Sequence, residues 1–352
     1  MNYSSNYAQG SGVDANRTAP DALTESPANT AAARSSSVAP SAWPVGVRKD
    51  MISQLRADTT GRPSDRVRRS LDGKGNTMGN LSGKVALITG GARGQGRSHA
   101  LALAAEGVDL VVCDIGTDIA GCAYGMGTKE DLDETVRLIG KEGVQALGIV
   151  ADMRETDAVQ RVVDAAIERF GRIDILCANH GYVAYSTVED TTDEFWQEMI
   201  DNNLTGIFKI TRAVVPQMKR QGFGRIMLTA SHIARRGIQN TSAYAASKWG
   251  VIGFMKCLAF EVGPGITVNA ICPTMVDTRM VMNESTYRLF CPDIEQPTRA
   301  DFEARIVDPF GKGWYTADNV SRLVTFLAND VDGVYTGQVL DIAMGLTAAM
   351  SV

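Results

Sequence analysis

Runs of apolar residues alternate with amphipathic stretches along the chain from residue 81 onward. Seven of these runs have the length of a β-strand: Val85–Thr89, Leu110–Cys113, Ala146–Val150, Ile173–Ala178, Arg225–Thr229, Thr267–Cys272 and Gln338–Ile342. Amphipathic segments such as Asp157–Phe170 and Asp193–Met218 lie between them. Continuously apolar strands that alternate with helices predict a parallel sheet covered on both faces. We therefore expect an α/β fold, with one doubly wound Rossmann-type domain and a seven-stranded parallel sheet over residues 81–352.

Residues 1–80 have a different pattern. They are rich in Ser, Ala, Asn, Thr, Gly and Arg, and their aromatic residues are Tyr3, Tyr7 and Trp43. Such a segment cannot bury enough apolar surface to offset the entropy lost on ordering, so we predict a disordered, low-complexity extension. Met78 lies just before the first strand and is an alternative start. A dispensable tail or a targeting or partner-binding arm are the other interpretations.

Charge is unevenly divided between the two parts of the chain. Residues 1–80 hold ten Lys and Arg against seven Asp and Glu, a net charge of +3. The whole chain carries −5, which leaves −8 for the remainder. An acidic folded part argues against nucleic-acid binding. No apolar run approaches the ~20 residues of a membrane span, and the N-terminus lacks the apolar core of a secretory signal.

The cysteines form no CxxC pair, and several lie in apolar strand-like runs, where cysteine behaves as a small hydrophobic residue. We expect reduced thiols and a cytoplasmic protein, with neither disulfides nor a metal site. The six positions are Cys113, Cys122, Cys177, Cys257, Cys272 and Cys291.

A glycine-rich loop directly follows the first predicted strand. Gly90, Gly94 and Gly96 lie in the sequence TGGARGQG, and a helix is expected from about Arg97. Glycines at these positions permit a tight turn and a close approach of the backbone to a pyrophosphate. The N-terminus of the following helix adds unpaired N–H groups and the positive end of its dipole. The strand–loop–helix context therefore predicts a dinucleotide site.

The choice between NAD and NADP depends on Asp114 and Arg93. Asp114 ends the second predicted strand, where its carboxylate can accept hydrogen bonds from the adenosine ribose and would repel a 2′-phosphate. Arg93 in the glycine loop is the competing signal, because it could pair with that phosphate. Since Ile115 rather than a second basic residue follows Asp114, we predict NAD.

Tyr244 and Lys248 are four residues apart, and Ser231 lies thirteen residues before Tyr244. Positions i and i+4 share one face of a helix. An ammonium beside a phenol favours the phenolate, so we expect the pKa of Tyr244 to fall from about 10. The tyrosine would then exchange protons near neutral pH.

With these features the chain resembles the short-chain dehydrogenase/reductase family over about residues 81–345. The matching motifs are TGxxxGxG at Thr89–Gly96, Asp152 after the third strand, Asn179-His180-Gly181 in place of NAG, Asn203 in NNLTG, the set of Ser231, Tyr244 and Lys248, and Pro273–Thr278. We interpret His180, which replaces a small residue, as a structural histidine.

The resemblance implies a role for each matching residue. Tyr244 would be the acid–base group and Ser231 would orient the substrate oxygen. Lys248 would lower the pKa of Tyr244 and bind the nicotinamide ribose, while Asn203 would hold a water on the proton path. The residues implied to bind NAD are Gly90, Arg93, Gly94, Gln95, Gly96, Asp114, Asp152, Met153, Asn179, Lys248, Pro273, Val276 and Thr278.

Within the family, the chain resembles the mycofactocin-dependent, carveol-dehydrogenase-like subgroup. The similarity lies in GARGQGRSHA at the loop, in an insertion at about 115–128 before KEDLDETVRLI, and in NESTYRLFCPDIEQPTRADFEARI. In this subgroup the insertion is thought to fold over the adenosine and to retain the nicotinamide cofactor, which is then reoxidised by mycofactocin. The resemblance thus implies mycofactocin as the electron acceptor.

The substrate is expected to be an apolar secondary alcohol or its ketone, and the resemblance favours a cyclic or terpenoid one. The stretch 278–306 is predicted to form a lid, with Met280, Met282, Tyr287, Leu289 and Phe290 suited to apolar contacts. Alternatives are an ordinary short-chain dehydrogenase that exchanges free NAD and a catalytically silent NAD-binding regulator. Family members usually form tetramers through the helices that carry Asn203 and Tyr244, so we expect a homotetramer.

Overall fold

The computed structural model of the protein describes residues 81–306, 314–343 and 345–346. The prediction for residues 1–80 therefore falls outside the described residues. The elements are β1 (Val85–Thr89), α3 (Gly94–Ala105), β2 (Asp109–Asp114), α4 (Lys129–Gly140), β3 (Ala146–Val150), α5 (Thr156–Phe170), β4 (Ile175–Ala178), α6 (Asp193–Ile200), a π-helical turn (Asp201–Thr205), α7 (Gly206–Gln221), β5 (Gly224–Thr229), a 3₁₀ turn (His232–Ala234), α8 (Ser242–Glu261), β6 (Ile266–Pro273), α9 (Glu284–Phe290), α10 (Arg299–Arg305), α11 (Ala317–Ala328) and β7 (Val339–Ile342).

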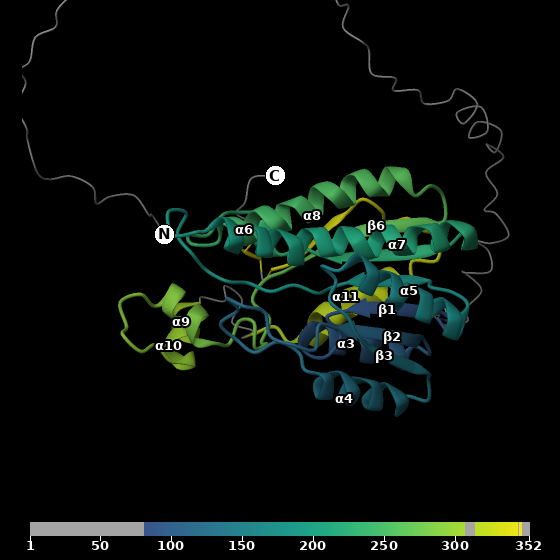
Figure 1. The fold of residues 1–352 in the computed structure, drawn as a ribbon, viewed down its shortest axis with the longest axis horizontal. Coiled ribbons are helices and arrows are strands. Elements are labelled where there is room, and N and C mark those ends of the chain that lie inside the picture. Colours follow the sequence, from purple (N-terminus) through teal and green to yellow (C-terminus); the bar gives the residue numbers. More distant parts are fainter. Residues whose placement is uncertain (1–80, 307–313, 344, 347–352) are drawn as a thin grey trace, which may run out of the picture. The chain divides into compact units, whose positions relative to one another are not determined.

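The strands form one parallel sheet of seven strands in the order β3-β2-β1-β4-β5-β6-β7, as predicted. Helices cover both faces of this sheet (Figure 1). Successive side chains of β1 face opposite layers: Leu87 joins the core formed with α5, α7 and α8, and Ile88 joins the core formed with α3, α4 and α11. Apolar side chains on both sides of one strand explain why the strands lack alternation in sequence.

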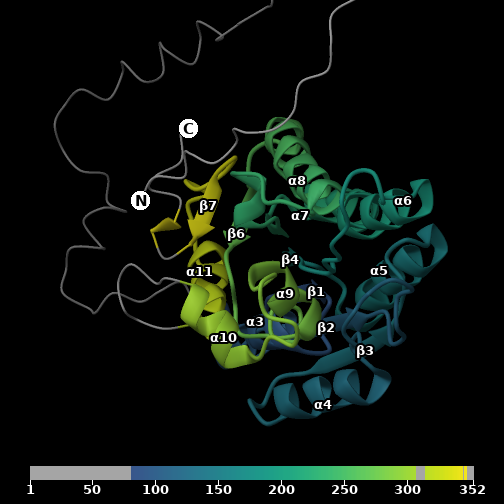
Figure 2. The same ribbon diagram turned by 90° about the vertical axis from the view of Figure 1, so that its left-hand side faces the viewer.

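The chain reverses its direction of travel across the sheet between β1 and β4, which are neighbours. In open α/β sheets, a crevice forms at such a point beside the carboxyl ends of the strands. Two excursions leave that end of the sheet: residues 115–128 between β2 and α4, and α9 with α10 after β6. Figure 2 shows α9 in front of the central strands, with α10 to its side.

The stretch Asp193–Met218 contains a break that its amphipathic pattern does not predict. The helix ends at Ile200, a π-helical turn covers Asp201–Thr205, and α7 continues from Gly206. A single π-turn inside a helix commonly marks a functional position. Here it carries the predicted Asn203.

Candidate active site

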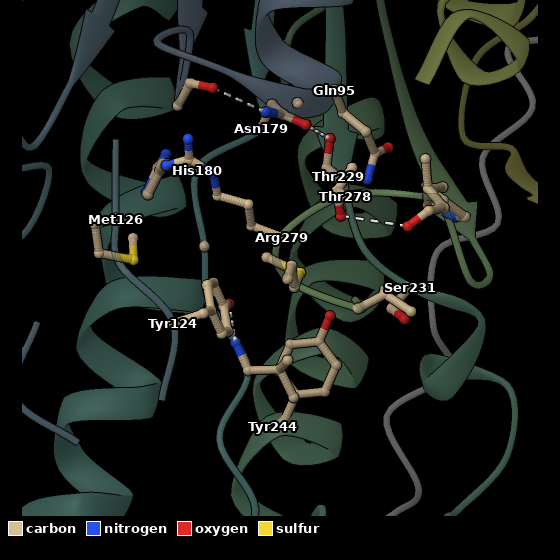
Figure 3. Close-up of a pocket in the computed structure, with 18 of the residues that line it drawn as sticks. Gln95, Tyr124, Met126, Asn179, His180, Thr229, Ser231, Tyr244, Thr278 and Arg279 are labelled. Atoms are coloured by element: carbon tan, nitrogen blue, oxygen red, sulfur yellow. Dashed lines mark hydrogen bonds between the residues drawn. The ribbon is translucent and has the colours of Figure 1, made fainter. Parts of the chain in front are cut away.

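A cavity of about 460 Å³ opens at the carboxyl ends of the strands (Figure 3). It is lined by side chains from the glycine loop, the insertion, the ends of β4, β5 and β6, and α8. Of the predicted site residues, Gly90, Arg93, Gly94, Gln95, Asp114, Asp152, Met153, Asn179, Ser231, Tyr244, Lys248, Pro273, Val276 and Thr278 line the cavity. The exceptions are Gly96 and Asn203, which do not line the cavity.

The glycine loop has the close backbone packing that its sequence predicts. Gly90 and Gly94 have φ of 66° and 54°, in the left-handed region that favours glycine. A Cβ at Gly96 would lie 2.0 Å from the carbonyl oxygen of Gly90, so this position admits no side chain. The helix begins at Gly94 rather than at about Arg97. The predicted start lay three residues too far along the chain, because glycines are poor helix formers. Here, however, two glycines lie in the first turn.

Unpaired polar atoms around this loop fit a nucleotide cofactor. The Nη1 of Arg93 and the Oε1 of Gln95 are buried, and no described residue bonds to them. The first turn of α3 also leaves backbone N–H groups without intrahelical partners. The Nη1 of Arg93 and these N–H groups are donors beside a glycine cradle, which is the chemistry that a pyrophosphate requires, whereas the Oε1 of Gln95 is an acceptor. The residues present therefore fit NAD.

Asp114 ends β2 with its carboxylate fixed by the backbone. The N–H groups of Ala92 and Ile115 each donate to one carboxylate oxygen, at 2.9 Å in both cases. Burial raises the pKa of Asp114, against these two hydrogen bonds. A Cβ at Gly127 would lie 3.1 Å from the Asp114 carboxyl, so the insertion packs directly on this group. The carboxylate keeps lone pairs for the ribose hydroxyls.

The insertion closes over the glycine loop. Arg93 donates a hydrogen bond to the carbonyl of Gly125, and its guanidinium lies 6.0 Å from the ring of Tyr124. The Tyr124 hydroxyl in turn accepts a hydrogen bond of 3.1 Å from the N–H of Val183 (Figure 3). Arg93 is thus held by the insertion through its Nη2, while its Nη1 has no partner among the described residues.

Asp152, Met153 and Asn179 line the cavity after β3 and β4. The Asp152 carboxylate pairs with Arg154 at 2.6 Å. The Asn179 amide spans two strands: its Nδ2 donates to Gly90 O at 3.5 Å and its Oδ1 accepts from Thr229 Oγ1 at 3.3 Å. Asn179 therefore joins the glycine loop to the end of β5.

Tyr244 lies in the first turn of α8, and Ser231 follows β5 across the cavity (Figure 3). A hydrogen bond joins the two side chains. The prediction that the pKa of Tyr244 falls is wrong for the protein without cofactor: burial raises this pKa to about 12, against the Ser231 hydrogen bond. Burial penalises the charged phenolate, and the hydrogen bond from Ser231 offsets only part of that penalty.

Lys248 lies one turn after Tyr244, as the spacing predicts, and its Nζ is 5.9 Å from the centre of the Tyr244 ring. The ammonium donates to the carbonyl of Thr229 at 2.9 Å. Burial lowers the pKa of Lys248 to about 8. A Cβ at Gly181 would lie 3.2 Å from this Nζ and 2.8 Å from Asn203 Oδ1. A side chain at position 181 would therefore collide with the Lys248 and Asn203 side chains.

Asn203 is fully buried beside the cavity, and its side chain is already paired. Its Oδ1 accepts from the N–H of Tyr182 at 2.9 Å, and its Nδ2 donates to the carbonyl of the same residue at 2.8 Å. The side chain therefore fixes the loop after β4.

His180 lies in the loop after β4 and ties it to β1. Its Nδ1 lies 2.7 Å from Thr89 Oγ1 at the end of β1. Burial, together with the Lys248 ammonium, lowers the pKa of His180 to about 3. The ring packs against Gly206, where a Cβ would lie 2.6 Å from Nε2. A neutral, buried ring that is bonded at Nδ1 agrees with the structural interpretation, while its Nε2 has no partner among the described residues.

The lid contributes only part of its predicted apolar set to the cavity. Met280, Leu289 and Phe290 line it, whereas Met282 and Tyr287 do not. Tyr287 instead packs on the buried ring of Phe302, 5.3 Å away between centroids. Tyr287 therefore packs the lid together instead of lining the cavity.

The sequence-based prediction did not name many of the cavity residues, and four of them carry polar side chains close to the predicted groups. Tyr124 comes from the insertion, and Tyr185 reaches the lid through a 3.1 Å hydrogen bond between its hydroxyl and Thr286. His232 and Thr274 directly follow Ser231 and Pro273. Adjacency to the predicted residues was the available signal for the last two.

The described residues contain no candidate metal site, membrane-spanning helix or disulfide. No group of His, Cys, Asp or Glu within the described ranges could hold a metal ion. Among the helices that the structure describes, none is long and apolar enough to cross a membrane. All six cysteines are free.

Comparisons with known proteins agree with this geometry. A family model described as short chain dehydrogenase matches residues 84–288. The (-)-trans-carveol dehydrogenase of Rhodococcus erythropolis is 39% identical over 275 residues, which cover 77% of this chain and 99% of that protein. The crystal structure of carveol dehydrogenase from Mycobacterium avium in complex with NAD is 42% identical, with a TM-score of 0.72 over 76% of this chain and 98% of the other.

A further solved structure, that of levodione reductase, is 34% identical, with a TM-score of 0.68 over 76% of this chain and 99% of the other. The matches span nearly the whole length of these relatives and leave the first part of this chain uncovered. The chain therefore belongs to the short-chain dehydrogenase family and to its carveol-dehydrogenase-like group.

Proposed function

We propose that this protein interconverts a cyclic or terpenoid secondary alcohol and its ketone, with a tightly held NAD that mycofactocin reoxidises. At the coarser level, the protein is an NAD-dependent oxidoreductase of alcohols and ketones. The meeting of Tyr244, Ser231 and Lys248 in one cavity with the glycine loop is the observation that carries the proposal. Two relatives are named carveol dehydrogenases, and carveol is a cyclic secondary alcohol.

The proposed chemistry separates a proton from a hydride. Bound NAD supplies the hydride acceptor or donor. Tyr244 removes the hydroxyl proton in the oxidising direction and returns it in the reducing direction. Ser231, which bonds to Tyr244, orients the substrate oxygen. General acid–base catalysis of this kind contributes about 10²–10⁴-fold in rate.

The raised pKa of Tyr244 sets a requirement on the loaded site. A phenol with a pKa of about 12 is almost wholly protonated at neutral pH. Bringing the pKa to about 8 would take four units, or about 5 kcal/mol of interaction that favours the phenolate. Lys248 and the positive charge of the oxidised nicotinamide are the two cations that could supply it. Lys248 alone, in the cavity without cofactor, does not.

Retention of the cofactor is supported by the insertion. The carbonyl of Gly125 accepts from Arg93, and Gly127 packs on Asp114, so 115–128 covers both the loop and the predicted ribose site. Release of a nucleotide from beneath this cover would require these contacts to break. An ordinary short-chain dehydrogenase that exchanges free NAD is the alternative.

One experiment separates these two functions. The purified full-length protein is denatured, and the released nucleotide is identified and compared in amount with the protein. We expect near-stoichiometric NAD(H), no steady turnover of carveol with free NAD, and steady turnover once mycofactocin or an artificial electron acceptor is added. Steady turnover with free NAD and no acceptor would instead establish the exchanging enzyme.

A silent NAD-binding regulator is the proposal's competitor from another class. Such a protein would bind NAD without reducing it when an alcohol is added. Absorbance at 340 nm therefore distinguishes the two, since the proposed enzyme reduces its bound nicotinamide once per site even without a carrier.

We also propose that the protein is a cytoplasmic homotetramer assembled through α7 and α8. Apolar side chains exposed on these helices support the assembly: Phe208 is 39%, Trp249 52% and Phe260 92% exposed. Large exposed apolar side chains on one pair of helices are typical of an interface. Sedimentation at micromolar concentration should give the mass of four chains, and a monomer would contradict the assembly.

A further inference from the structure

Several buried polar side chains that line the cavity, among them Asn202, His232 and Thr274, have atoms without a hydrogen-bond partner among the described residues, and two of these follow the strands β5 and β6. His232 is 5% exposed, and both of its ring nitrogens are unpaired. Thr274 is 8% exposed, and its hydroxyl oxygen is unpaired. Burying such an atom without a partner costs about 1–3 kcal/mol, so native proteins pair most of them. Two such side chains in one cavity indicate that a ligand completes their bonding.

These residues lie next to the groups assigned to the chemistry. His232 directly follows Ser231, and Thr274 follows the end of β6, the strand that pairs with β5. The position of His232 is fixed, because it begins a 3₁₀ turn in which Ile233 N donates to Ser231 Oγ at 3.3 Å. Thr274 is fixed by a 3.0 Å hydrogen bond from its N–H to the carbonyl of Ile342.

The subsite is uncharged. Burial lowers the pKa of His232 to about 4, and Arg236 acts in the same direction. A neutral imidazole offers one donor and one acceptor, and a threonine hydroxyl offers both. Such a pair suits a hydroxyl, carbonyl or ether oxygen. It suits a carboxylate or phosphate less well, because neither His232 nor Thr274 carries a positive charge.

The other two histidines differ from His232 in this respect. The Nδ1 of His99 lies 2.8 Å from Ser321 Oγ, and that of His180 lies 2.7 Å from Thr89 Oγ1. Each of these rings is therefore anchored by one bond within the fold. His232 has none, although it is as deeply buried.

We propose that His232 and Thr274 form a second polar subsite, which binds an uncharged oxygen of the substrate other than the reacting one. The preferred substrates would then be cyclic alcohols or ketones that carry a second hydroxyl, carbonyl or ether oxygen. The neighbouring cavity residues Val183, Ile233 and Ile238 would contact the hydrocarbon ring between the two oxygens. This inference rests on the proposed function and narrows its substrate class.

The test compares cyclohexanol with the positional and stereoisomers of cyclohexanediol. Turnover by the full-length protein is followed through the absorbance of an artificial electron acceptor, which reoxidises the bound nicotinamide and is itself reduced, and kcat/KM is measured for each alcohol. A site built to bond a second oxygen discriminates against an analogue that lacks it. We expect at least one diol to exceed cyclohexanol by at least about tenfold per reacting hydroxyl.

Substitutions then assign that preference to the subsite. His232→Phe should reduce the ratio for the preferred diol to within about threefold of unity, whereas His232→Asn, which keeps a donor and an acceptor, should retain more of it. His99→Phe makes the same change at a buried histidine outside the cavity and should keep the wild-type ratio. Thr274→Val removes only the unpaired hydroxyl and serves if His232→Phe does not fold.

Each outcome bears on one statement. A wild-type ratio near one for every diol, or a ratio that neither His232→Phe nor Thr274→Val changes, overturns the subsite; a water that permanently pairs these groups would give that result. If the wild-type protein turns over none of the cyclic alcohols, carveol included, the proposed function itself fails.

Discussion

Mild acid should destabilise this protein strongly, because all three of its histidines are buried in neutral form. His99, His180 and His232 are each less than a tenth exposed. Burial lowers their pKa values to about 4, about 3 and about 4, from about 6.5 in an unfolded chain. Below pH 6.5 the unfolded chain therefore binds more protons than the folded one. The stability from these groups is complete above that pH and is lost as the pH falls toward the folded values.

The size of the effect follows from the pKa differences. At pH 5 an unfolded histidine is almost fully protonated and a folded one almost fully neutral, which shifts the free energy of unfolding by about 2 kcal/mol for each residue. Three residues together give about 6 kcal/mol. This is comparable to the whole stability of many proteins, which is about 5–15 kcal/mol.

The assay is urea unfolding, followed by far-UV circular dichroism between pH 8 and pH 5. We expect little change from pH 8 to 7 and a fall of about 4 kcal/mol per pH unit near pH 5. His99→Phe, outside the cavity, should make this dependence about one third shallower. A total loss below about 2 kcal/mol between pH 8 and 5, or a loss confined to pH values below 4, would refute the reasoning, since it would assign the titration to carboxylates.

Three further predictions concern the active site. Gly96→Ala should abolish NAD retention, because its Cβ would lie 2.0 Å from the Gly90 carbonyl oxygen; co-purified nucleotide measures this, and Gly140→Ala, with nothing within 4 Å, should retain it. Tyr244→Phe should lower turnover at least about 10²-fold with an unchanged circular dichroism spectrum, and alcohol oxidation by the wild type should rise with pH, because the phenol must lose its proton; near-normal turnover of the variant would remove Tyr244 from the mechanism. Asp114→Ser should reduce the preference for NAD over NADP by about tenfold, measured as the ratio of dissociation constants for the refolded apoprotein, and an unchanged ratio would contradict its assigned role.

The sheet could be predicted from the sequence because its five inner strands are buried on both faces and its two edge strands, β3 and β7, are still largely apolar runs. Val85–Thr89 and Ala146–Val150 match the prediction at both ends, and the other strands differ by one or two residues. Their apolar runs are bounded by polar or glycine residues, which leaves few alternative boundaries. The cavity residues could be predicted from the motifs, because each motif comes directly after a strand. The carboxyl ends of these parallel strands lie side by side, which brings the motifs together.

The differences arise where long-range contacts decide the outcome. Helix α3 starts at Gly94 because the backbone of Gly90 packs against it, a contact that helix propensity does not include. The pKa of Tyr244 rises because the site is buried, and the spacing to Lys248 gives charge proximity without the depth of burial. The unpaired ring of His232 could not be predicted either, because a bonding deficit appears only once all neighbours are placed.

The cover that 115–128 forms over the glycine loop has a thermodynamic consequence. A nicotinamide retained beneath it behaves as a prosthetic group, so its redox state no longer follows the cellular ratio of free NAD to NADH. The direction of the reaction then depends on the potential of the bound couple relative to that of its carrier. Contacts that favour the oxidised or the reduced nicotinamide would set that potential, since a tenfold preference for one redox form shifts a two-electron couple by about 30 mV. The insertion would therefore separate this alcohol's oxidation from the redox balance of the free nicotinamide pool.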